Sequence, residues 1–158
     1  MSNLKLECSF KHTHAKFNKE TNKQEPFFFR LQAKIENLQV IEGKGAGMLK
    51  GVTVMHEGSE DYEKVQSESV KLAKKYLADL PDLTSIETKA VTNIDEDVDV
   101  INGTRKLNEI TVEVEVVKYQ KFGDNVGIVG SAKMSAQGST LFEAQDKAIK
   151  LAKSELGL

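Results

Sequence analysis

Apolar and polar residues alternate along the first forty residues of the chain. In the opening segment LKLECSFK, every second position is apolar, at Leu4, Leu6, Cys8 and Phe10. The segment FFFRLQAKIENLQVI alternates again after a polar stretch. A period of two is typical of strands with one buried face, so we predict a hairpin. Beyond Ile35 the apolar positions change parity, which indicates a bulge or bend.

A third strand and a helix are expected to follow this hairpin. The glycine-containing loop EGKGAG leads into the strand-like segment MLKGVTVM. Apolar or small residues then recur with the period of an α-helix, at Tyr62, Val65, Ser69, Leu72, Tyr76 and Leu80. Glu60, Asp61 and Glu63 place negative charge at the start of this helix, where the helix dipole favours it. Pro81 ends it.

The second half of the chain repeats this order. The tetrapeptide Lys-Leu-Ala-Lys stands at 71–74 and again at 150–153, an offset of 79 in a chain of 158 residues. At this offset, without a gap, the strand patterns coincide, and the parity changes again after Val116. Thr140 and Glu143 have the spacing of a capping box, and Gly157 ends the second helix. A shared irregularity favours duplication over chance.

The two halves together define the expected fold. Each unit has the order strand, strand, strand, helix. We predict a single α+β domain over residues 1–158, built by tandem duplication from two repeats, 1–79 and 80–158, related by a pseudo-twofold. An antiparallel sheet would carry both helices packed on one face.

Composition narrows the functional classes. Charged residues make up 29% of the chain and the net charge is −2, which argues against a dedicated binder of duplex DNA. The single cysteine, Cys8, cannot form an internal disulfide, so a reducing compartment fits. We see no signal peptide, and no segment approaches the roughly 20 apolar residues of a membrane helix. We therefore expect a cytoplasmic protein with no membrane partner.

The small net charge hides an uneven distribution. Residues 5–34 carry seven basic and three acidic residues, a net charge of +4, whereas residues 84–113 carry three basic and seven acidic residues, a net charge of −4. Both hairpins could simply be solvated arms. A basic hairpin could instead meet the acidic hairpin of another copy in a head-to-tail contact, which makes rings or filaments. The acidic residues expected at such a contact are Asp95, Glu96, Asp97 and Asp99.

A third interpretation is that the basic hairpin binds an anionic ligand. Aromatic residues among bases are what single-stranded nucleic acid binding uses, and Phe27, Phe28 and Phe29 stand beside Arg30. Phe27 and Phe29 have the buried parity, which leaves Phe28 to stack on a base. The basic hairpin would contribute Lys11, His12, His14, Lys16, Lys19, Lys23 and Arg30.

Other chemistry is weakly indicated. Cys8, His12 and His14 share one strand parity and could hold a metal ion or make a reactive thiol, but no paired Cys-x-x-Cys motif accompanies them. The acidic run DEDVDV lacks the glycine and closing glutamate of a calcium loop, so a solvated turn is expected there. The segment GKGAG lacks the ending of a phosphate loop. We therefore expect no metal, no cofactor and no catalytic residue.

Two family resemblances are present. The order of three strands and a helix, ending in FEAQDKAIKLAKSELGL, resembles the core of phage-type single-strand annealing proteins. That resemblance implies a DNA groove on a ring or filament, lined by a hairpin and a lysine-bearing helix. The helix positions carried over are Lys147, Lys150 and Lys153, with Lys71, Lys74 and Lys75 in the first unit. Separately, the run from GVTVMHEGSEDYEKVQ to GTRKLNEITVEVEV is similar to the strand–helix–hairpin run of SIMPL domains.

The sequence thus favours a non-catalytic binding and assembly protein. The most specific hypothesis is binding or annealing of single-stranded nucleic acid by an oligomer. One alternative is a self-assembling structural or protein-interaction module that docks head to tail. Another is a small Cys/His metal protein or enzyme.

Overall fold

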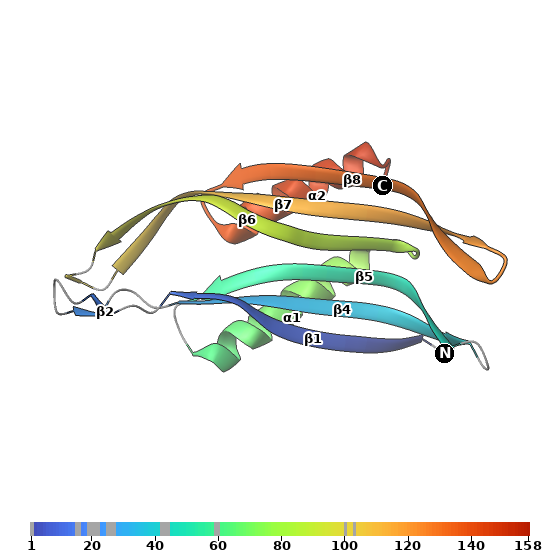
Figure 1. Ribbon diagram of the computed structural model, residues 1–158, viewed down its shortest axis with the longest axis horizontal. Coiled ribbons are helices and arrows are strands. Elements are labelled where there is room, and N and C mark those ends of the chain that lie inside the picture. The colour runs from blue at the N-terminus through green and yellow to red at the C-terminus, as the bar shows by residue number, and fades with distance from the viewer. Residues whose placement is uncertain are drawn as a thin grey trace.

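The computed structural model describes residues 2–14, 17–18, 23–24, 28–41, 45–58, 61–99, 101–102 and 104–158. The strands are β1 (Ser2–His14), β2 (Phe17–Asn18), β3 (Lys23–Gln24), β4 (Phe28–Ile41), β5 (Gly45–Gly58), β6 (Thr84–Asp99), β7 (Thr104–Phe122) and β8 (Asn125–Gly138). The helices are α1 (Tyr62–Asp79) and α2 (Leu141–Glu155). The predicted α+β class is confirmed (Figure 1).

Six strands form one sheet in the order β1-β4-β5-β6-β7-β8, and β2 pairs with β3 separately. Neighbours in the six-stranded sheet run antiparallel except β5 and β6, which pair in parallel through Lys50–Thr53 and Thr84–Glu87. The parallel pair follows from the connection, because α1 returns the chain to the end of the sheet where β5 began. The sheet is therefore mostly antiparallel, with β1 and β8 as its outer strands on opposite sides of the view in Figure 1.

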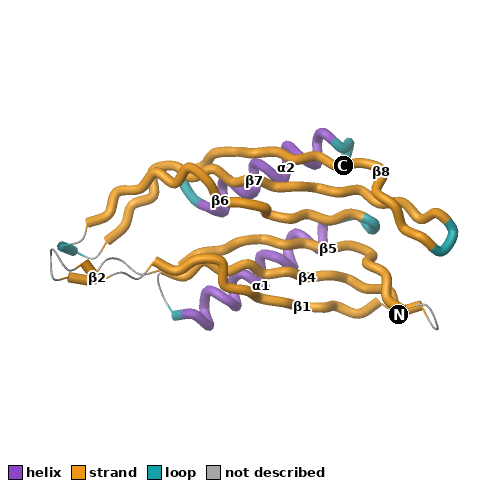
Figure 2. The backbone as a smooth tube through the Cα atoms, viewed as in Figure 1, coloured by secondary structure: helices purple, strands orange, loops and turns teal. Residues whose placement is uncertain are grey.

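The core lies between the strands and the helices. α1 contacts β4 and β5, whereas α2 contacts β7, β8 and β5. Figure 2 shows both helices behind the strands. The strands contribute alternate branched residues, and the helices contribute small ones, so that helix and sheet approach closely. The fully buried members include Leu31, Ala33, Val54, Val112, Val114, Ala73, Ala144 and Ala148.

One local prediction is confirmed: at the start of α2, the Thr140 hydroxyl accepts a hydrogen bond from the Glu143 amide at 3.0 Å. The cap depends on a few neighbouring residues, which is why the sequence pattern revealed it. The two expected irregularities lie near register shifts, between Asn37 and Leu38 and between Lys118 and Tyr119. The extra residue, however, is on the partner strand in each case, Leu49 of β5 and Val129 of β8.

Other boundaries differ from the prediction. β5 begins at Gly45, inside the segment predicted as a loop. The acidic segment predicted as a solvated turn lies in β6, where Asp95 is opposite Glu109 and Asp97 is opposite Lys106. β7 is long enough to pair with this segment, and backbone pairing outweighs its charged composition. No helix in the described ranges has the length and apolar character needed to cross a membrane.

Candidate interaction surface

The parallel contact between β5 and β6 is short, and a side chain from α2 completes it. Beyond Thr53 and Glu87 no further residues of the two strands pair. The fully buried Gln145 accepts a hydrogen bond from the Met55 amide at 2.9 Å and donates one to the Met55 carbonyl at 3.3 Å. The Thr88 hydroxyl donates to the same Gln145 oxygen at 2.6 Å. The Gln145 amide thus takes the place of a neighbouring strand and satisfies buried backbone groups.

Further contacts join the two halves of the chain around this junction. The Gln32 side chain donates to the Thr88 carbonyl at 3.5 Å, and the Lys50 ammonium donates to the Leu80 carbonyl at 3.1 Å. The Tyr76 hydroxyl on α1 donates to Asp146 on α2 at 2.8 Å. We call this junction of β5 with β6 the seam. It is closed by backbone pairing, by side chains of the sheet and by a hydrogen bond between the two helices.

The two outer edges of the sheet contrast with this closed seam. In the part of the chain that the structure describes, no strand pairs with the outer side of β1 or of β8. Leu4 and Leu6 on β1 are 63% and 49% exposed, and Ile128 on β8 is 65% exposed. Open strand edges flanked by exposed apolar side chains are sites at which another chain can add.

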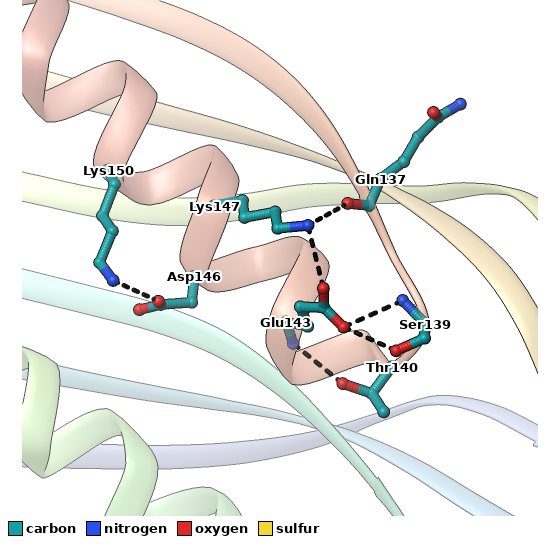
Figure 3. Close-up of polar contacts among 7 residues, drawn as sticks. All are labelled: Gln137, Ser139, Thr140, Glu143, Asp146, Lys147 and Lys150. Carbon is teal, nitrogen blue, oxygen red and sulfur yellow. Dashed lines mark hydrogen bonds and ion pairs between the residues drawn. The ribbon is translucent and has the colours of Figure 1, made fainter.

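A groove runs between β8 and α2. Its volume is about 560 Å³, and it is lined by Ser135, Ala136, Gln137, Lys147, Lys150 and Leu151. Figure 3 shows its two lysines with their partners. Lys147 pairs with Glu143 at 2.9 Å and reaches the Gln137 carbonyl at 3.5 Å, and Lys150 pairs with Asp146 at 2.9 Å. The groove therefore combines an apolar part with ammonium groups that already have acidic partners.

The carboxylates beside the groove stay ionised at neutral pH. The Ser139 hydroxyl and the Lys147 ammonium lower the pKa of Glu143 to about 2. Burial alone would raise the pKa of Asp146, but hydrogen bonds from Lys150 and Tyr76 outweigh it and lower the pKa. Burial, assisted by the hydrogen bond to Asp146, raises the pKa of Tyr76. The positive charge of Lys147 and Lys150 is therefore locally balanced.

The predicted nucleic-acid residues fall in several places. Lys16 and Lys19 lie outside the described residues. The backbone is described, but not the side chain, at Lys11, His12 and His14 on β1, Lys23 on β3 and Phe28 on β4. Arg30 is only 4% exposed, and its Nε and Nη2 donate to the Glu57 carboxylate at 3.2 and 2.8 Å. Its guanidinium is thus held in a buried ion pair.

The remaining helix lysine, Lys153, lies in the last turn of α2 and is partly exposed. Lys147, Lys150 and Lys153 thus lie on one helix, and the first two line the groove.

The predicted acidic contact residues lie along the far end of β6. Asp97 accepts a hydrogen bond from the Asn108 side chain at 3.0 Å. Asp99 accepts from the amides of Ile101 and Asn102, both at 3.1 Å, and so begins the turn to β7. The paired end of the β6–β7 hairpin therefore contains all four acidic residues, Asp95, Glu96, Asp97 and Asp99. All of them except Glu96 are exposed.

Cys8 is partly buried and packs against the core cluster. The register of β1 on β4 shifts between Phe10 and His12, which interrupts the alternation that grouped Cys8 with the two histidines. Within the described ranges, no group of three or more His, Cys, Asp or Glu residues is placed to hold a metal ion. The Cys/His alternative stays a prediction.

Sequence reasoning missed Gln145 and the groove. The available signal was a glutamine on the apolar stripe of the second helix, between Leu141, Ala144 and Ala148. An uncharged polar residue at such a position needs a buried partner, and here the partner is the end of β5.

Comparison of the chain with protein-family models, with curated proteins and with solved structures gives no significant match. The arguments about function that follow therefore depend on the geometry of the edges, the seam and the groove.

Proposed function

We propose that this protein is a non-catalytic assembly module whose copies join head to tail through the open edges of their sheets. The observation that carries this proposal is the contrast between the closed β5–β6 seam and the exposed edges of β1 and β8. Because β1 and β8 are different surfaces, a contact between them is heterologous. Repeated contacts of that kind build rings or filaments.

The proposal includes a tandem duplication that places both helices on one face of the sheet. Three antiparallel strands and a helix occur in each half, as β1-β4-β5-α1 and as β6-β7-β8-α2. The register shifts near Asn37 and near Lys118 support the same idea. A chain that already joins two such units side by side has the surfaces needed to join more.

Single-stranded nucleic acid binding is the second candidate. Lys147 and Lys150, which the resemblance to annealing proteins singled out, line the groove beside β8. An assembly of many copies would repeat these lysines at regular intervals, although each has an acidic partner within its own copy. Fluorescence anisotropy of a labelled single-stranded oligonucleotide tests this candidate. A flat titration at low salt, with protein in the tens of micromolar, would exclude it.

Self-association is tested by sedimentation velocity over a range of protein concentrations. We expect the mass to rise with concentration, and Leu6→Lys to return the protein to the monomer because it places a charge on the exposed β1 edge. Ile101→Lys is the matched control, since Ile101 is 77% exposed in the β6–β7 turn, away from both edges. A wild-type protein that stays monomeric into the hundreds of micromolar would refute the proposed function.

A further inference from the structure

The internal registers show which positions on the outer strands correspond to the closed seam. On β4, Ile35 lies opposite Leu6 of β1 and Val52 of β5. On β7, Val114 lies opposite Thr88 of β6 and Met134 of β8. Leu6 therefore corresponds to Thr88, and Val52 corresponds to Met134.

The directions of the strands also agree. β1 runs antiparallel to β4 and parallel to β5, and β8 runs parallel to β6, so β1 and β8 point the same way. A sheet that continued from β8 of one copy into β1 of another with the same facing would make a parallel pair. That is the pairing already present between β5 and β6.

We propose that β8 of one copy pairs in parallel with β1 of the next, in the register that β5 and β6 use inside the chain. This inference rests on the proposed function and gives it a partner surface, a second copy of this chain, and a register. The seam residues Lys50–Thr53 correspond to 132–135 on β8, and Thr84–Glu87 correspond to 2–5 on β1. Met134 then lies opposite Leu4, and Ser135 lies opposite Lys5.

Corresponding side chains are buried at the seam and exposed at the edges. Ile86, on β6, is 2% exposed, whereas its counterpart Leu4 is 63% exposed. Leu72, on α1, packs against the core, whereas Leu151 at the matching turn of α2 is 51% exposed in the groove. A second copy placed by the seam geometry covers both leucines, which accounts for their exposure on a single chain.

The helix side of the edge repeats this contrast. Gln66 on α1 stands 79 residues before Gln145. Its side chain is partly exposed, and the side-chain amide forms no hydrogen bond with the residues that the structure describes. Met55, to which Gln145 binds, corresponds to Gln137 on β8. The Gln137 carbonyl accepts a long hydrogen bond from Lys147 at 3.5 Å, and a carbonyl oxygen can accept a second one. In the assembly, Gln66 binds the backbone of Gln137 in the neighbouring copy.

A disulfide experiment tests the register. In a Cys8→Ser background, one protein carries Lys5→Cys and another carries Ser135→Cys. On mixing and mild oxidation we expect a mixed disulfide, because facing positions on paired strands lie within disulfide reach. Lys133→Cys replaces Ser135→Cys in the offset control, because it lies two residues along the same face, about 7 Å away.

The positive control is Thr53→Cys with Glu87→Cys in one chain. These positions correspond to Ser135 and Lys5 and face each other in the seam, so an intrachain disulfide is expected. A disulfide formed by Lys5→Cys protein alone would indicate β1–β1 pairing and would overturn the inference. So would equal cross-linking in the offset control.

Sedimentation separates the two proposals. If the protein associates but Lys5→Cys and Ser135→Cys do not cross-link, the parallel register is wrong while assembly stands. If it does not associate, both proposals fail.

Gln66→Leu gives a second readout. We expect it to weaken association about tenfold, as the loss of one good hydrogen-bonded contact does, with the thermal midpoint of the monomer unchanged. Unchanged association would overturn the proposed role of Gln66.

Discussion

Gln145 on α2 binds Met55 on β5 through both backbone polar groups of that residue, although the two positions are 90 residues apart in the chain. The side-chain amide accepts from the Met55 amide and donates to its carbonyl, as a neighbouring strand would. Because this contact is fully buried, water cannot replace it. Gln145 therefore supplies the two backbone hydrogen bonds that β6 does not give to Met55.

Replacing Gln145 with leucine is expected to lower the free energy of unfolding by about 2–4 kcal/mol, because the Met55 amide and carbonyl lose their partner in a buried position. Urea denaturation followed by circular dichroism measures this loss. Gln66→Leu is the matched control on α1, and at concentrations that keep the protein monomeric it is expected to change stability by less than about 0.5 kcal/mol. Equal losses in the two variants would show that Gln145 has no special structural role.

The buried ion pair between Arg30 and Glu57 gives a second prediction. Their side chains are 5% and 15% exposed, so Glu57→Ala leaves a guanidinium charge in a poorly hydrated site. We expect a loss of about 3 kcal/mol in the free energy of unfolding, and partial recovery in the double variant Arg30→Met with Glu57→Ala. The exposed pair of Lys5 and Glu7 provides the control, since Glu7→Gln should not measurably change stability. A double variant no more stable than Glu57→Ala would count against the argument.

The pH dependence of α2 follows from Glu143. Its pKa is lowered from 4.5 to about 2 in the folded protein, so the unfolded chain binds a proton first as the pH falls. The contribution of Glu143 to stability is therefore present above pH 4.5 and is lost as the pH falls toward about 2. Thermal midpoints measured from pH 7 to pH 2 should fall less steeply in Glu143→Gln than in the wild type. Parallel curves for the two proteins would contradict this assignment.

Tyr76 links α1 to α2 and should ionise later than an ordinary tyrosine in a titration of the folded protein. Burial and the hydrogen bond to Asp146 raise its pKa above the ordinary value of 10.0, so it stays protonated where an ordinary tyrosine ionises. Absorbance at alkaline pH should show its ionisation as a late step that Tyr76→Phe removes. Its contribution to stability is complete below pH 10.0 and is lost as the pH rises above that value. Tyr76→Phe should cost about 1 kcal/mol at neutral pH, measured by urea denaturation.

The limits of prediction from this sequence follow from the range of each interaction. The cap at Thr140 depends on a few neighbouring residues, and the pattern revealed it. The register shifts near Asn37 and Lys118 depend on two strands at once, and their extra residues lie on the facing strands, at Leu49 and Val129. The parallel seam brings β5 beside β6 through an intervening helix, and no local pattern specifies that pairing. The role of Gln145 was hidden for the same reason, since its partner is 90 residues away.

The gapless alignment of the two halves holds for some elements of the fold and not for others. An offset of 79 relates Ile35 to Val114, but Ile35 lies opposite Val52 while Val114 lies opposite Met134, which gives an offset of 82 on the third strand. An offset of 79 would pair Gly51 with Gly130 on the third strand, and these two glycines are therefore not equivalent positions in the sheet. The charge of Arg30 is likewise a poor guide to its role. A basic residue in a basic hairpin suggests a phosphate contact, but the Arg30 side chain is buried in an ion pair with Glu57.

The contact between Met55 and Gln145 also has a consequence for the order of synthesis. When β5 leaves the ribosome, the residues that complete its outer end, Thr84–Glu87 and Gln145, have not yet been made. The nascent first half therefore exposes the same kind of strand edge that β8 offers in the finished chain. If copies pair through β1 as proposed, slower synthesis between α1 and α2 should lengthen the time during which this edge is open to another copy.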